Sequence, residues 1–150
     1  MKDSNVMIHV EDLKKSFGNA NVLNGITTDI KKGEVLVIIG PSGCGKSTFL
    51  RCLNMLETPT GGHIYLDGVD VTSPKTDINK TRQSMMMVFQ HFNLFPHMTI
   101  LENLTIAPTK LQNKSKSEAE KEAIELLKRV GLEDRANAYP SQLSGGQKQR

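Results

Sequence analysis

The chain has 150 residues, and its 19 Lys and Arg against 16 Asp and Glu leave a formal net charge of +3 at pH 7. This small excess of positive charge points to no polyanionic partner. With 37% hydrophobic residues, 23% charged residues and two cysteines, the composition indicates a soluble globular protein and excludes disordered, collagen-like and disulfide-stapled classes.

The apolar runs are too short to cross a membrane. The longest, residues 35–39 and 85–89, have five residues each, whereas a bilayer span needs about 20. The N-terminus also lacks the apolar stretch of a secretion signal, which predicts a cytosolic location. Any membrane role should therefore be peripheral.

The first strands are predicted from local composition. Residues 6–10 and 21–30 are β-leaning segments, which we expect in an antiparallel sheet. Residues 35–39, Val-Leu-Val-Ile-Ile, are apolar throughout, as a strand buried on both faces of a parallel sheet must be. Residues 85–89 predict a further strand of this kind.

A helix and a hairpin follow the first strands. Apolar residues at helical spacing predict a helix over 47–56. Asp67-Gly68 is a tight-turn sequence, and it predicts a hairpin between residues 63–66 and 69–71.

The pattern changes to helices after residue 90. Thr99 with Glu102 forms a capping-box sequence, and Pro108 should limit the helix that starts there. A second capping box, Ser117 with Glu120, should start a helix that ends at Gly131 in the C′ position. Residues 143–150 begin a further helix-like stretch.

Residues 40–47 match the phosphate-loop pattern G-x-x-x-x-G-K-[ST]. Its glycines let consecutive N–H groups point at an anion, and the following helix adds the positive end of its dipole. Lys46 should bridge the β- and γ-phosphates, and the Ser47 hydroxyl is a hard oxygen ligand for Mg²⁺. The residues expected to bind the nucleotide here are Gly40, Pro41, Ser42, Gly43, Cys44, Gly45, Lys46, Ser47 and Thr48.

The alternative interpretation is a flexible glycine loop with a surface lysine. That alternative does not explain the apolar run before the loop or the apolar-faced helix after it.

Residues 143–147, Leu-Ser-Gly-Gly-Gln, resemble the signature motif of ABC ATPases. Ser144 can cap a helix, and Gly145 and Gly146 let backbone N–H groups approach an anion. The resemblance implies that Ser144, Gly145, Gly146 and Gln147 contact the γ-phosphate held by the opposite subunit. Without the phosphate loop, this motif would be interpreted as an ordinary serine-capped turn.

Two further positions match the family. Gln90 resembles the Q-loop glutamine, whose amide oxygen meets Mg²⁺ and whose loop contacts the membrane partner; the alternative is a solvated glutamine at a strand end. Phe17 resembles the aromatic residue that stacks on adenine, and the alternative is a core phenylalanine. Lys46 and Gln90 are thus the expected catalytic residues, with Ser47 and Gln90 on the metal.

The resemblance implies an α/β fold, a P-loop NTPase of the ABC ATPase type that is incomplete at the C-terminus. We expect residues 1–89 to form the antiparallel β-subdomain and phosphate-loop core, including a parallel core sheet. Residues 90–150 should form the Q-loop, helical subdomain and signature motif.

Residues 89–99 and 138–143 look most similar to ATP-binding subunits of polar amino-acid importers. The implied cofactors are ATP and Mg²⁺. The implied partners are a second copy that sandwiches ATP, integral-membrane permease subunits at the cytoplasmic face of the membrane and, indirectly, a substrate-binding protein. Lipoprotein-release exporters carry similar Q-loop sequences, so an ABC exporter remains an alternative, and the transported substrate stays open.

The family pattern continues after the signature with the Walker B aspartate, the catalytic glutamate and the switch histidine, which are not in these residues. Glu133 and Asp134 precede the signature and cannot replace the acidic pair. We therefore expect an inactive fragment of an ATPase. Without neighbouring strands, we also expect the chain to be marginally stable or prone to aggregate.

Two other functional classes are considered. A soluble ABC ATPase acting on nucleic acid or ribosomes would agree with the slight positive charge, but Lys14-Lys15 and Lys31-Lys32 are more typical of solvated faces, so no nucleic-acid partner is predicted. A small-molecule P-loop kinase would need a substrate lid and no Leu-Ser-Gly-Gly-Gln motif.

Overall fold

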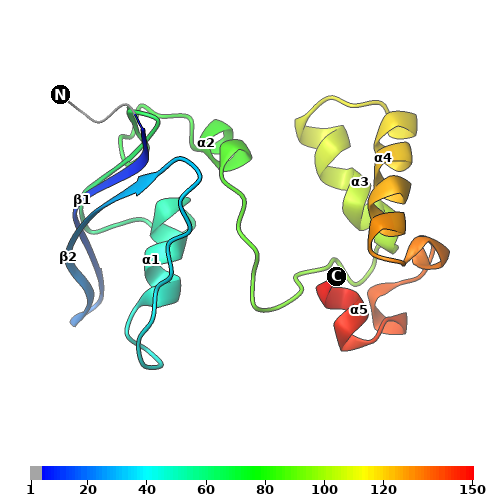
Figure 1. Ribbon diagram of the computed structural model, residues 1–150, viewed down its shortest axis with the longest axis horizontal. Helices are drawn as coiled ribbons and strands as arrows, with labels where there is room; N and C mark the ends of the chain where they lie inside the picture. Colours follow the sequence, from blue (N-terminus) through cyan, green and yellow to red (C-terminus); the bar gives the residue numbers. More distant parts are fainter. Residues whose placement is uncertain (1–4) are drawn as a thin grey trace. The chain divides into compact units, whose positions relative to one another are not determined.

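The structure, a computed structural model, describes residues 5–150. The chain divides into two compact units between Met87 and Val88, and Figure 1 shows the elements of each. No helix of the described residues has both the length and the apolar character that crossing a membrane requires.

The first unit contains an antiparallel sheet of four strands in the order β2-β1-β3-β4. The strands are β1 (Val6–Phe17), β2 (Ala20–Lys31), β3 (Gly61–Leu66) and β4 (Val69–Asp70). The predicted antiparallel pairing of the first two strands is confirmed, although both are longer than their β-leaning segments. The additional residues of each strand form hydrogen bonds with the neighbouring strand, and local composition does not predict such nonlocal bonds.

The predicted hairpin between β3 and β4 is also confirmed. Leu66 pairs with Val69 across a two-residue turn. Asp67 and Gly68 occupy this turn with φ of 48° and 80°. Two central residues with positive φ characterise the type I′ turn, whose twist suits an antiparallel hairpin.

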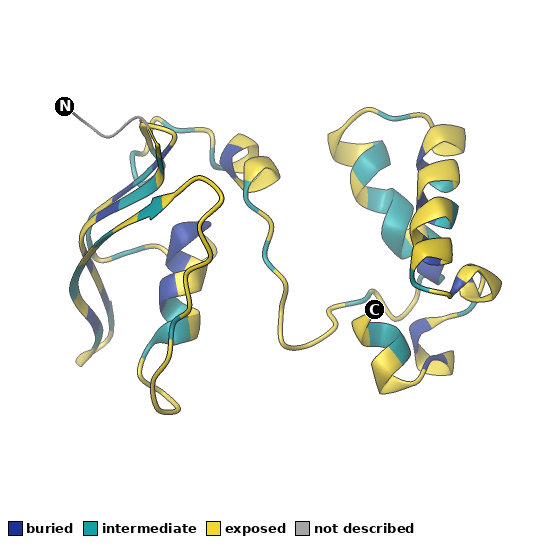
Figure 2. Ribbon diagram, viewed as in Figure 1, coloured by how far each residue is buried: buried dark blue, intermediate teal, exposed yellow. Residues whose placement is uncertain are grey.

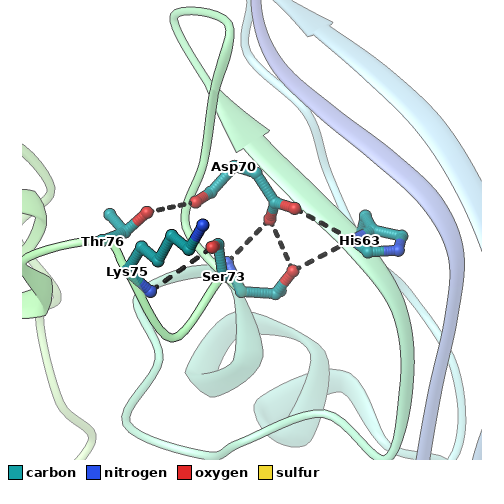
Figure 3. Close-up of polar contacts among 6 residues, drawn as sticks. His63, Asp70, Ser73, Lys75 and Thr76 are labelled. Atoms are coloured by element: carbon teal, nitrogen blue, oxygen red, sulfur yellow. Dashed lines mark hydrogen bonds and ion pairs between the residues drawn. The ribbon is translucent and has the colours of Figure 1, made fainter.

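Hydrogen bonds of Asp70 connect the end of this hairpin to the segment that follows it (Figure 3). Its carboxylate accepts hydrogen bonds from the Thr72 hydroxyl at 2.5 Å and the Thr72 N–H at 2.9 Å, and it lies 3.0 Å from His63 Nδ1. The Thr76 hydroxyl donates to the Asp70 carbonyl oxygen at 2.6 Å. Burial alone would raise the pKa of the Asp70 carboxyl, but the hydrogen bonds from Thr72 and His63 outweigh it and lower this pKa.

This pKa predicts an acid sensitivity. Because the folded pKa of Asp70 lies below its unfolded value of about 3.9, the carboxylate stabilises the fold above that pH, and the contribution is lost as the pH falls through the folded pKa. Asp70→Asn should therefore lower the urea midpoint at pH 6 and lower it less at pH 3. An equal loss at both pH values would contradict the prediction.

Helix α1 (Lys46–Leu53) packs on the sheet through Phe49, Cys52 and Leu53. Figure 2 shows buried segments on this helix and on the strands of the same unit. Cys52 is fully buried, and burial raises the pKa of its thiol to about 11. The helix ends at Leu53 and not at the predicted residue 56, since the backbone reverses at Met55 with φ of 56°. The core of this unit consists of Val10, Leu13, Leu23, Phe49, Cys52, Leu53, Ile64, Leu66 and Val71.

The parallel core sheet predicted around residues 35–39 is not formed in the described part of the chain. Every ladder there is antiparallel, and neither residues 35–39 nor residues 85–89 form a strand. Val35 and Val88 are 88% and 97% exposed. A strand needs neighbours to accept and donate its ladder bonds, and these two segments have none within residues 5–150.

Helix α2 (Ile78–Ser84) lies in a polar stretch for which no element was predicted. The Asp77 carboxylate caps it by accepting hydrogen bonds from the N–H groups of Asn79 and Lys80. An aspartate at this position is an N-cap signal, but the segment lacks the apolar stripe on which the helix prediction depended.

The second unit is helical, with α3 (Ile100–Leu111) and α4 (Lys116–Arg129) as its long elements. The capping box of Thr99 and Glu102 is confirmed. The prediction that Pro108 limits α3 is wrong, because the helix continues one turn past it. The Thr109 hydroxyl donates to the Thr105 carbonyl oxygen at 2.8 Å and supplies one hydrogen bond within this turn.

The start of α4 lies two residues before the predicted one. The capping box is formed by Ser115 and Glu118, not by Ser117 and Glu120. Both pairs satisfy the same S-x-x-E spacing, so the sequence pattern could not distinguish them. At the other end, Gly131 has φ of 64° and lies at C′ as predicted.

The short elements of the second unit are two 3-10 turns, η1 (Glu133–Arg135) and η2 (Pro140–Gln142), and the helix α5 (Gly145–Gln149). The core of this unit consists of Ile100, Leu127, Leu132, Ala136 and Leu143.

Candidate functional site

The loop of residues 40–45 leads directly into helix α1. Gly45 is the N-cap of α1, and within the described residues no side chain caps this helix start. Gly43 and Gly45 have φ of 80° and 94°. The start of α1 thus offers backbone N–H groups and the positive end of the helix dipole to an anion.

Gly45 brings the loop close to strand β2. A Cβ at this position would lie 3.0 Å from Val22 Cγ1, 3.1 Å from Leu23 Cδ2 and 3.2 Å from the Val22 carbonyl oxygen. The positive φ and this close approach both favour glycine. By contrast, a Cβ on Gly43 would meet no atom within 4 Å, so this face of the loop is open to a ligand.

Lys46 reaches back over the loop. Its ammonium donates to the carbonyl oxygens of Gly40 at 2.9 Å and Pro41 at 2.7 Å, and it lies 3.6 Å from Cys44 Sγ. The ammonium is positively charged, and the uncapped helix start carries partial positive charge. Together they suit a negatively charged phosphate group.

Hydroxyl groups are the available metal ligands near the loop. Ser47 is exposed in the first turn of α1. Residues 5–150 contain no cluster of three His, Cys, Asp or Glu side chains that could hold a metal ion. Mg²⁺ does not require such a cluster, because it is commonly held by one or two protein oxygens together with phosphate oxygens and water. The donor set therefore fits Mg²⁺ bound together with a nucleotide.

Phe17 is not a core residue, so the alternative interpretation of Phe17 as a core phenylalanine is wrong. It ends β1, its residue surface is 47% exposed, and the Lys15 ammonium lies 4.6 Å from its ring centroid. Lys15 itself is buried, and it forms an ion pair with Glu57 at 2.6 Å. Nearly half of the Phe17 residue surface is therefore open to solvent, with a cation over the ring.

The signature residues form the start of α5 in the second unit. Ser144 is the N-cap, its hydroxyl accepts from the Gln147 N–H, and Gln147 Oε1 accepts from the Ser144 N–H at 2.9 Å. The predicted cap is therefore confirmed. A Cβ on Gly145 or Gly146 would meet nothing within 4 Å, so their backbone is open to a ligand.

Gln90 is exposed in a segment without regular structure at the start of the second unit. The side chain of Asn103, in α3, holds the end of this segment. Asn103 was not identified as a structural residue from the sequence. Its Oδ1 accepts from the Phe95 N–H at 2.8 Å, and its Nδ2 donates to carbonyl oxygens of Phe95, Met98 and Thr99. The sequence signal for this role is an asparagine inside a predicted helix, because asparagine side chains often bond to nearby backbone groups.

The structure thus brings residues 40–48 together at one end of α1 and places Phe17 in the same unit. Gln90 and residues 144–147 belong to the second unit.

A glycine loop after an apolar segment, an uncapped helix start and a lysine that folds over the loop define a phosphate loop of the P-loop nucleotide-binding class. A family model described as "ABC transporter" matches residues 23–150. The chain belongs to the ABC transporter family, as its signature sequence predicts.

Several curated relatives are named for amino-acid transport. The chain is 56% identical over 144 residues to the arginine transport ATP-binding protein ArtM of Bacillus subtilis strain 168. It is 54% identical to the glutamine transport ATP-binding protein GlnQ and 49% identical to the glutamate/aspartate import protein GltL, both of Escherichia coli K12. Each alignment covers 96% of this chain, and the chain spans 60% of the length of these relatives. The predicted resemblance to the amino-acid uptake group is confirmed.

Solved structures confirm the fold class. The dimeric ATP-binding cassette MJ0796 bound to ADP and Pi matches with a TM-score of 0.80 and 35% identity, over 95% of this chain and 65% of that one. CbiO1 from Clostridium perfringens, part of the ABC transporter complex CbiONQ, matches with a TM-score of 0.78 and 31% identity, over 97% of this chain and 58% of that one.

Proposed function

We propose that the chain forms the ATP-binding part of the energy-coupling subunit of an amino-acid importer. The observation that carries this proposal is the phosphate loop at the start of α1, with Lys46 folded over it. The names of the relatives support the amino-acid assignment, since arginine, glutamine and glutamate/aspartate transport proteins all match across most of the chain.

In this proposal, loop amides and Lys46 would hold the β- and γ-phosphates, Ser47 would offer Mg²⁺ an oxygen ligand, and the Phe17 ring would stack on adenine. The family resemblance assigns Gln90 to the metal. Residues 144–147 contact the γ-phosphate of a second copy across a dimer. The dimeric state of the MJ0796 cassette supports this arrangement. The remaining partners are permease subunits, with the protein held peripherally at the cytoplasmic face of the membrane.

Calorimetric titration with nucleotides tests the proposal. ATP with Mg²⁺ should bind, and AMP should bind at least about tenfold more weakly because it lacks the two phosphates that the loop and Lys46 contact. Lys32→Ala, which removes an exposed lysine from a surface turn, is the control and should leave the affinity unchanged. Equal affinity for ATP and AMP, or no binding of ATP, would refute the proposed function.

A further inference from the structure

The C-terminal end of helix α1 is held by an arginine from α2. Arg82 Nη2 donates to the Met55 carbonyl oxygen at 2.6 Å, and Arg82 Nε donates to the Asn54 carbonyl oxygen at 3.3 Å. These two carbonyl groups lie just past the last residue of α1. One guanidinium thus contacts two successive carbonyl groups where the helix ends.

The backbone at this end adopts a conformation that the sequence does not favour. Met55 has φ of 56°, in the left-handed region, at the C′ position that glycine usually occupies. A residue with a Cβ keeps this conformation when surrounding contacts hold it there. The donation from Arg82 to its carbonyl oxygen is such a contact.

Charge and geometry both suit an arginine at this place. The carbonyl groups at a helix C-terminus carry partial negative charge, which the guanidinium opposes. The planar group presents two donors in fixed directions, whereas a lysine ammonium is a single point charge. The buried Asn54 strengthens the same end, since its Oδ1 accepts from the Leu56 N–H at 3.2 Å and its Nδ2 lies 3.6 Å from Met87 Sδ.

The length of α1 connects this end to the phosphate loop. The helix has eight residues, which is too short to be stable without contacts that fix it. Its first residue is Lys46, and no side chain in the described residues caps that end. Backbone N–H groups of Met55 and Glu57 donate to the carbonyl oxygens of Cys52 and Arg51, both at 3.0 Å, and these bonds depend on the left-handed turn at Met55. Fraying that starts when this turn loses the support of Arg82 would extend within two turns to the residues of the loop.

We propose that Arg82 is a positioning residue for the phosphate loop, which acts by capping the C-terminus of α1. The proposal rests on the proposed function, since it concerns the binding of ATP at the other end of the same helix. Loss of the cap lowers the fraction of molecules with a complete α1, and the apparent affinity falls by that fraction.

The test compares the ATP affinity of Arg82 variants at a temperature where circular dichroism shows each variant fully folded. Arg82→Gln should weaken ATP binding about three- to tenfold, and Arg82→Lys should weaken it less. In the Met55→Gly background, where the left-handed residue needs no support, Arg82→Gln should cost less than about twofold. Equal losses in both backgrounds, or no loss, would overturn the proposal.

Two controls separate positioning from charge and from stability. Lys80→Gln removes a positive charge from an exposed position of α2, the helix that also carries Arg82, and should leave the ATP affinity unchanged. Ile64→Val loosens the sheet core and should lower the melting temperature without changing the affinity of the folded protein. A loss of affinity with Ile64→Val equal to that with Arg82→Gln would assign the effect to stability and refute the proposal.

Amide hydrogen exchange tests the cap without nucleotide. Exchange of residues 49–53 should be faster in Arg82→Gln than in the unmodified chain, and unchanged exchange would refute the capping step even if ATP did not bind. Failure of ATP to bind the unmodified chain would instead refute the proposed function. If Arg82→Gln does not fold, Arg82→Lys provides the same comparison.

Discussion

Lys46→Ala should remove most of the affinity of the chain for ATP. The substitution deletes the ammonium that lies over the loop and that we assign to the β- and γ-phosphates. Losing charge-assisted hydrogen bonds to a bound anion costs about 2–3 kcal/mol, which corresponds to a roughly 30- to 150-fold weaker affinity. Calorimetric titration with ATP and Mg²⁺ measures this difference directly.

Lys46 also donates to two carbonyl oxygens of the loop, so Lys46→Ala could change the loop conformation as well as phosphate binding. Two control variants address this. Lys46→Met keeps most of the aliphatic stem and removes the charge, so its affinity should fall as far as that of Lys46→Ala. Lys32→Ala should bind ATP like the unmodified chain. Undiminished binding by a folded Lys46→Ala variant would show that the phosphate role of Lys46 is wrong.

Gly62→Ala should be strongly destabilising, whereas Gly68→Ala should be mild. Both glycines have φ of 80°, so both substitutions place alanine in the same unfavourable backbone region. They differ in surroundings, since a Cβ at Gly62 would lie 2.3 Å from the Asp12 carbonyl oxygen and 2.5 Å from that of Glu11. A Cβ at Gly68 would meet nothing within 4 Å.

The matched pair therefore separates backbone strain from steric overlap. Gly68→Ala should cost about 1 kcal/mol of unfolding free energy from strain alone. Gly62→Ala should cost at least about 3 kcal/mol, because backbone atoms of β1 would have to move away from β3. Urea unfolding measures both values, and similar losses for the two variants would contradict the packing of β1 against β3.

Local signals predicted the parts of the fold that local interactions stabilise. The turn of Asp67 and Gly68, the cap of Thr99 and the C′ glycine Gly131 all follow from the preferences of one or two residues, and all are confirmed. The ambiguous case was α4, where Ser115 and Ser117 offer the same capping spacing and the structure uses the earlier one.

Nonlocal interactions account for the failures. Residues 35–39 have the apolar composition of a buried strand, yet a strand forms only beside partners, and the described residues offer none. Composition records the preference of a segment and not the presence of its neighbours. The large exposed apolar surface of Val35 and Ile39 is the direct result.

The same division applies to the candidate site. The loop glycines, Lys46 and the cap of Ser144 were predicted because their spacing along the chain encodes their geometry. Asn103 and Arg82 could not be predicted, since each acts on backbone groups through a fold-dependent contact. Arg82, for example, contacts a carbonyl group 27 residues away.

The two cysteines differ in a way that makes the phosphate loop chemically addressable. Cys44 is exposed within the loop, whereas Cys52 is fully buried and its raised pKa keeps it a neutral thiol near pH 7. Thiol-directed reagents attack the accessible thiolate. A single fluorescent maleimide should therefore label Cys44 selectively, which gives the unaltered sequence a built-in attachment point for a reporter beside Lys46.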